Sequence, residues 1–168
     1  MSKGIEKLRE EYHNIKYKIS DLAIELGGSV SVEPINQDFL HWKGCIPGPK
    51  NSPYSGGLFF FEIKFDSNYP YSAPDIQMRT PIYHPNIAPR SGHISTDLLH
   101  NWNKWNDNHD VYSLILEIFC LLARPNEQNA YQPYKKDPEK AKEFTYKYAT
   151  QSQEIDWNNS WDKGWNNN

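Results

Sequence analysis

Four short apolar segments between residues 29 and 78 constrain the fold most, because the connectors between them are too short to hold crossover helices. The segments are SVSVEPI (29–35), DFLHWKGCI (38–46), LFFFEIKF (58–65) and DIQM (75–78). Their β-branched and aromatic residues favour strands, and the connectors PGPKNSPYSGG and DSNYPYSAP are rich in turn-forming residues. Parallel neighbours need longer crossover connections, so we expect a four-stranded antiparallel meander.

Helical patterns flank this predicted sheet. Apolar residues spaced by three and four run from Ile5 to Leu26 and predict a helix that ends at Gly27-Gly28. The stretch 111–123 (VYSLILEIFCLLA) is apolar almost all round, which predicts a helix buried in the centre of the fold. Asp137-Pro138 supplies a cap and a first-turn proline for a last helix. Strands and helices are segregated along the chain, which indicates an α+β fold.

Two segments lack a regular period. Residues 79–110 are rich in Pro, Asn and Asp, and an irregular segment of that length inside a compact domain is usually functional. Residues 156–168 (DWNNSWDKGWNNN) change composition abruptly, with tryptophans four apart at Trp157, Trp161 and Trp165. They are typical either of a flexible tail or of an aromatic stripe that folds against this domain or a partner. We expect one domain over residues 3–155 and a separate tail over 156–168.

Charge and cysteine content exclude several classes of function. The net charge of −3 provides no general attraction to nucleic acid or to anionic membranes, so neither is an expected partner. The first residues lack the apolar core of a signal peptide, and we expect a cytoplasmic or nuclear protein. Cys45 and Cys120 are too few for a disulfide framework, and we expect both to be buried. The histidines show no ligand spacing and no glycine-rich phosphate loop is present, so we expect no metal and no cofactor.

Several short motifs follow one another in a familiar order. They are His41-Trp42, Gly48-Pro49, Ser52-Pro53-Tyr54, Gly56-Gly57, Tyr69-Pro70, Pro74 and His84-Pro85-Asn86. Each is weak alone, but together they make residues 39–87 resemble the central sheet of the ubiquitin-conjugating enzymes. The resemblance extends over roughly residues 3–150. It implies a carrier that accepts ubiquitin or a similar modifier from an activating enzyme as a cysteine thioester and passes it to a lysine, usually with a ligase.

The resemblance also places a serine where the family has its nucleophile. The acceptor cysteine of the family follows the His-Pro-Asn turn in a G-x-[IV]-C-x-D-x-[LI] pattern, which here is GHISTDLL (92–99) with Ser95 in the cysteine's place. The connecting loop is one residue longer than in most members. A serine hydroxyl needs a dedicated base, whereas a thiol is partly ionised at neutral pH. His93 lies two residues away, so a Ser-His pair stays formally open.

Further expectations follow from the resemblance position by position. The Asn86 amide would stabilise the oxyanion formed during transfer, or it would cap the local turn. Asn129 stands where many members place an acidic residue that deprotonates the incoming lysine. The ligase-contacting loop reads Trp105-Asn106-Asp107-Asn108, with Asp107 and Asn108 as contact candidates beside the apolar Phe65. Ser31 matches the sheet face that binds a second ubiquitin in some relatives.

Three functional hypotheses remain open at this stage. The chain is either a cysteine-less relative that binds ubiquitin or a partner carrier noncovalently, or an active acyl transferase whose acceptor cysteine has been replaced experimentally by Ser95. The third hypothesis is an interaction protein that acts through its tryptophan tail. The expected partners are ubiquitin or a ubiquitin-like modifier, an activating enzyme, a ligase and another conjugating enzyme.

Overall fold

The computed structural model describes residues 2–95, 105–131 and 136–158 of the chain. Helix α1 (Lys3–Leu26) begins where the Ser2 side chain accepts a hydrogen bond from the Ile5 N–H, and it ends where Gly27 adopts a φ of 80°. That left-handed conformation costs glycine little, which is why the helix stops at the predicted position. In the described part of the chain no helix is long and apolar enough to cross a membrane.

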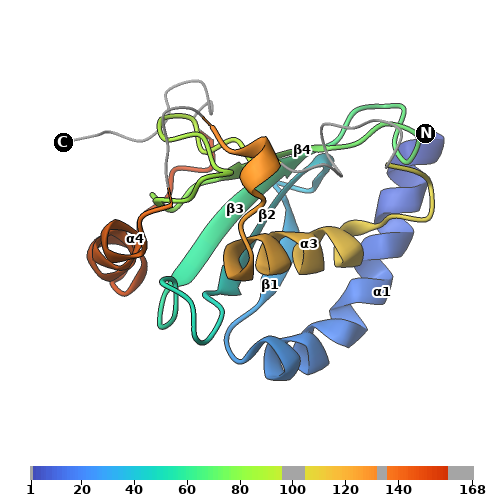
Figure 1. Ribbon diagram of the computed structural model, residues 1–168. Helices are drawn as coiled ribbons and strands as arrows, with labels where there is room; N and C mark the ends of the chain where they lie inside the picture. Colours follow the sequence, from blue (N-terminus) through green and yellow to red (C-terminus); the bar gives the residue numbers. More distant parts are fainter. Residues whose placement is uncertain (1, 96–104, 132–135, 159–168) are drawn as a thin grey trace.

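The predicted meander is confirmed (Figure 1). Strands β1 (Ser31–Ile35), β2 (Asp38–Pro47), β3 (Leu58–Lys64) and β4 (Asp75–Met78) pair antiparallel in chain order. Alternation along β3 sends its fully buried residues Phe59, Phe61 and Ile63 to one face of the sheet and Phe60, Glu62 and Lys64 to the other. We call the second face the outer face of the sheet. By register it also carries Ser31, Glu33, Lys43 and Cys45.

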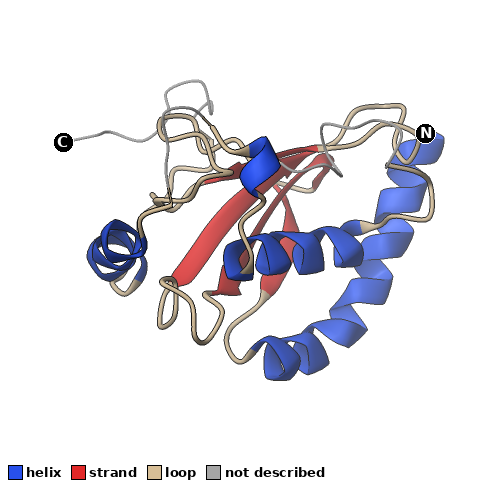
Figure 2. Ribbon diagram, in the orientation of Figure 1, coloured by secondary structure: helices blue, strands red, loops and turns tan. Residues whose placement is uncertain are grey.

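Helices α1 and α3 (Val111–Ala123) pack on the inner face and close the core, giving the α+β arrangement seen in Figure 2. The Tyr12 ring of α1 lies 5.5 Å from the Trp42 ring of β2 in an edge-to-face contact. Glu11 of α1 links the two helices to the connector between β3 and β4, because its carboxylate accepts hydrogen bonds from the Tyr69 hydroxyl and from the Val111 N–H at the start of α3.

Helix α3 also corrects one expectation. Its residues Leu114, Ile115, Ile118 and Leu122 are buried, but Cys120 is exposed, so the prediction that both cysteines are buried is wrong. Cys45 is buried in β2 as expected. The reason is that the buried residues of α3 lie on the side that packs on the sheet and α1, and within the described residues Cys120 lies on the opposite side of the helix.

The C-terminal part begins with the short 3₁₀-helix η1 (Glu127–Asn129), followed by α4 (Pro138–Phe144) and a π-helical turn, η2 (Thr145–Ala149). The Asp137 side chain accepts from the Lys140 N–H and Pro138 occupies the first turn, which confirms the predicted start. Trp157 lies in a turn, while Trp161 and Trp165 fall outside the described residues. The proposed domain boundary at 155/156 stays a prediction.

Candidate functional site

The His84-Pro85-Asn86 turn lies at the centre of the site and is held by a buried histidine. His84 is 0% exposed; its Nε2 lies 2.8 Å from the Leu121 carbonyl, and its Nδ1 accepts from the Asn86 N–H at 3.0 Å. These partners require a neutral ring that carries its proton on Nε2. Burial lowers the pKa of His84 to about 4. The side chain therefore anchors the turn to the end of α3 and is no proton carrier at neutral pH.

A hairpin after this turn brings Ser95 back beside it. The chain reverses at residues 88–93, where Gly92 has a φ of 75° and its N–H donates to the Ala88 carbonyl at 2.9 Å. The left-handed conformation suits glycine, which gives a structural reason for Gly92 in the sequence pattern. Ile94 pairs with Ile87, and the Ser95 N–H then donates to the Asn86 carbonyl at 2.7 Å. Ser95 is thus fixed beside the turn by its own backbone.

Tyr131 completes this arrangement and was missed by the sequence reasoning. Its N–H donates to the Pro85 carbonyl at 2.8 Å, and its phenol is hydrogen-bonded to the Ser95 side chain. Burial raises the pKa of Tyr131, while the hydrogen bond from Ser95 opposes that rise. A tyrosine two residues after Asn129 carries no pattern of its own, so no signal in the sequence identified it. It comes to Ser95 only because the chain after α3 folds back onto the turn.

The Asn86 side chain bonds to the loop that follows α3. Its Nδ2 donates to the Asn126 carbonyl at 2.6 Å, and its Oδ1 accepts from the Asn126 N–H at 2.8 Å. Asn86 is 0% exposed. The amide therefore holds a loop 40 residues away, which differs from the cap of the local turn considered from the sequence, and the oxyanion role stays a prediction.

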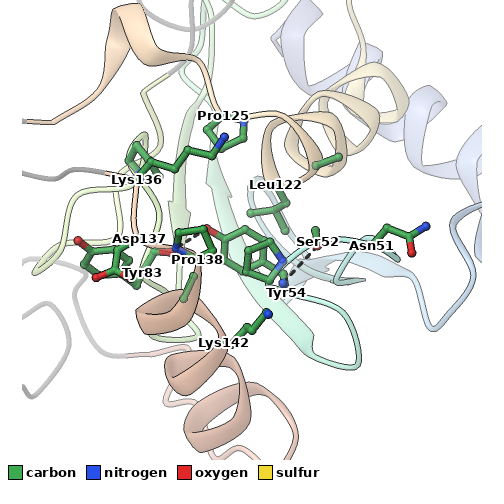
Figure 3. Close-up of a pocket in the computed structure, with 14 residues that line it drawn as sticks. Asn51, Ser52, Tyr54, Tyr83, Leu122, Pro125, Lys136, Asp137, Pro138 and Lys142 are labelled. Atoms are coloured by element: carbon green, nitrogen blue, oxygen red, sulfur yellow. Dashed lines mark hydrogen bonds between the residues drawn. The ribbon is translucent and has the colours of Figure 1, made fainter.

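A cavity of about 610 Å³ lies beside the turn (Figure 3). Its wall is formed by Tyr54, Pro85 and Leu122, and Lys136 and Lys142 belong to its lining. The Tyr54 hydroxyl donates to the Tyr83 carbonyl at 2.8 Å, which ties the loop between β2 and β3 to the residue before His84. Within the described ranges, no group of three His, Cys, Asp or Glu side chains could hold a metal ion.

Comparison with known proteins identifies the family of the chain. The family model described as ubiquitin-conjugating enzyme matches residues 9–154. The chain belongs to the ubiquitin-conjugating enzyme family. A crystal structure of a protein assigned as a ubiquitin-conjugating enzyme from Plasmodium yoelii is 28% identical, with a TM-score of 0.72, and covers 90% of this chain and 99% of that one.

A second solved structure agrees with this assignment. The E2 domain of a ubiquitin-conjugating enzyme from Toxoplasma gondii is also 28% identical, with a TM-score of 0.70, and covers 85% of this chain and 97% of that one. Membership of the ubiquitin-conjugating enzyme family implies ubiquitin, an activating enzyme and a ligase as classes of partner.

The residues predicted to contact a ligase are Phe65, Asp107 and Asn108. They lie near one end of the sheet. Phe65 is 6% exposed, and its ring lies 4.8 Å from that of Tyr69. Trp105 packs against the same tyrosine and donates from its indole N–H to the Pro70 carbonyl at 2.7 Å. The following turn is exposed at Asp107 and Asn108. Burial of the Phe65 ring supports its packing role, whereas the exposed turn is available for contact.

The remaining candidate residues are placed as follows. Ser31 is exposed on the outer face, with its hydroxyl 3.1 Å from the Cys45 sulfur. Asn129 lies in η1, in the same stretch of chain as Tyr131. Thr96, Asp97 and the rest of the motif to Leu99 lie outside the described residues. The roles assigned to Asn129, Asp107, Asn108 and Ser31 therefore stay predictions.

Proposed function

We propose that Ser95 stands at the acceptor position of the family, and that the chain as written binds ubiquitin or a partner carrier noncovalently, or retains an oxyester, without turning over. The observation that carries this proposal is the hydrogen bond from the Ser95 N–H to the Asn86 carbonyl at 2.7 Å. It holds residue 95 beside the His-Pro-Asn turn, and the side chain held there is a hydroxyl.

The chemistry of this hydroxyl favours retention over transfer. Attack by Oγ on the thioester of a charged activating enzyme would form an ester bond and release that enzyme's thiolate, with the serine proton passing to a base. The hydroxyl is hydrogen-bonded to the Tyr131 phenol, which is a poor base at neutral pH because burial raises its pKa and keeps it protonated. Release to a lysine amine would then have to expel an alkoxide, which is a poorer leaving group than a thiolate. An acyl group that reached Ser95 would therefore stay there.

A second function is supported by the intact scaffold: a thioester carrier whose cysteine at position 95 has been replaced. Three features of the scaffold do not depend on a thiol at residue 95. They are the buried His84, the Asn86–Asn126 hydrogen bonds and the hairpin that presents residue 95. A sulfur at position 95 would supply the nucleophile and the leaving group that the hydroxyl lacks. In either case we propose that the protein acts in the cytoplasm or nucleus, with Asp107 and Asn108 facing a ligase.

The test compares the chain with its Ser95→Cys and Ser95→Ala variants in the presence of activating enzyme, ATP and ubiquitin. We expect the unaltered chain to form either no adduct or one that resists reductant and is cleaved by alkali, and Ser95→Ala to form none. A reductant-sensitive adduct on Ser95→Cys that discharges onto lysine would favour the second function. Multiple turnover by the unaltered chain would overturn the first.

A further inference from the structure

The chain after η2 runs across the outer face of the sheet. We call residues Gln153–Asn158 the strap. At its start, the Gln153 side chain donates to the Leu58 carbonyl at 2.9 Å and accepts from the Thr80 hydroxyl at 2.6 Å. At its end, the Asn158 side chain accepts from the Asn36 amide at 3.1 Å. The strap therefore passes from β3 to the turn between β1 and β2.

Trp157 is the aromatic contact of the strap with the sheet. Its ring centroid lies 6.4 Å from that of Phe60, which points outward from β3. The Arg79 guanidinium and the Lys43 ammonium lie 5.4 and 5.7 Å from the same ring. Cations at these distances from an indole are attracted to its π face. Trp157 thus contacts an apolar ring and two positive charges at once.

The arginine at this contact is held in place by the sheet itself. Arg79 Nη1 lies 3.1 Å from a carboxylate oxygen of Glu62, whose side chain is 1% exposed. Its other nitrogen, Nη2, donates to the Asp156 carbonyl of the strap at 3.0 Å. The buried carboxylate holds the guanidinium from within the sheet, so part of the surface that contacts Trp157 is formed by β3 and the residue after β4.

The strap shares the outer face with the exposed Ser31. Four strands about 4.8 Å apart give a face about 15 Å wide between the outermost strand axes. A standard protein interface covers about 800 Å² on each partner, a patch roughly 30 Å across. A protein docked over Ser31 must therefore also cover β2 and β3, where Trp157 lies.

We propose that the strap is a built-in competitor for the outer face, so that ubiquitin binds there only when Trp157 has left Phe60. This inference rests on the proposed noncovalent binding of ubiquitin. Competition of this kind lowers the apparent affinity by the fraction of molecules in which the face is open. The strap then sets how strongly the chain holds ubiquitin on this face, independently of the chemistry at residue 95.

The test is a titration of the full ¹⁵N-labelled chain with unlabelled ubiquitin, repeated with Trp157→Ala. Ser152→Ala is the matched control, because Ser152 is an exposed residue just before the strap. Without ubiquitin, Trp157→Ala should shift the amide signals of Lys43 and Phe60, and Ser152→Ala should leave them in place. With ubiquitin, Trp157→Ala should raise the affinity at the outer face roughly 5- to 30-fold, the range expected for losing one aromatic contact with cations.

Equal ubiquitin affinity of the unaltered chain and Trp157→Ala would overturn the competition and leave the proposed function standing. Absence of ubiquitin binding in all three proteins would overturn both the competition and the noncovalent part of the proposed function. The oxyester assay at Ser95 reads the covalent part separately. The competition would be supported if Trp157→Ala bound ubiquitin more tightly and ubiquitin shifted the amide signals of Ser31 and its strand neighbours.

Discussion

The side chain of Asn86 and the backbone of Asn126 form a closed pair of hydrogen bonds, 2.6 Å and 2.8 Å long. The two residues are 40 positions apart in the chain, and the pair ties the His-Pro-Asn turn to the end of α3. The loop that follows carries Tyr131 to Ser95. The amide of Asn86 thus positions the surroundings of residue 95 through the loop.

This pairing predicts that Asn86→Ala lowers the free energy of unfolding by about 1–3 kcal/mol, because the Asn126 N–H and carbonyl lose their partners. Urea denaturation followed by circular dichroism measures the change. Asn108→Ala is the matched control, since Asn108 lies in an exposed turn, and should change stability by less than about 0.5 kcal/mol. A loss at Asn86 no larger than in this control would contradict the structural role.

Acid should destabilise the fold through His84. The pKa of this histidine is about 4 in the folded protein and about 6.5 in the unfolded chain, because burial disfavours the charged ring. The unfolded state therefore takes up a proton as the pH falls below about 6.5, and the folded state does so only near 4. The stability that His84 contributes is present above pH 6.5 and is lost between 6.5 and 4, by about 3 kcal/mol in all.

The NMR signal of the His84 ring measures the pKa of this histidine in the folded protein. Its Hε1 resonance should stay constant from pH 8 down to about 5 and move only below that. A His84 signal that titrates near pH 6.5 would show that the ring is accessible and would disprove the anchoring role.

Tyr69→Phe should cost about 1–2 kcal/mol of unfolding free energy, because the buried Glu11 carboxylate loses the hydroxyl that donates to both its oxygens. Burial raises the pKa of Glu11, and the bond from Tyr69 lowers it, so the variant raises this pKa further. Because the folded variant holds the Glu11 proton more tightly, the loss of stability should grow as the pH rises. Tyr146→Phe controls for the lost hydroxyl, since Tyr146 is 74% exposed.

The two cysteines should differ in their rate of reaction with a thiol reagent. Cys120 is exposed, whereas Cys45 is buried and burial raises the pKa of its thiol. The native protein should react rapidly with Ellman's reagent at one thiol per chain and at the second only after unfolding. In Cys120→Ser the fast phase should vanish. Retention of a fast phase in that variant would mean that β2 opens readily at Cys45.

The strands and the helix ends could be predicted from the sequence because they depend on interactions between residues close together in the chain. The alternation in β3, the left-handed Gly27 and the Asp137-Pro138 start of α4 depend on residues within a turn or a strand pair, and each lies where the pattern predicted it. Motif order was equally informative, since it identified the family that the comparisons confirm.

Tertiary structure alone decided which side chains meet. Tyr131 reaches Ser95, Trp157 reaches Phe60 and Cys120 is left exposed because of how layers and loops pack, and no periodicity in the sequence encodes those choices. The apolar composition of α3 predicted burial all round, yet among the described residues Cys120 of this helix is exposed. The sequence by itself determined the elements and their order, through short-range sterics and hydrogen bonding. The surroundings of residue 95 depend on contacts between distant segments, which exist only once the chain has packed.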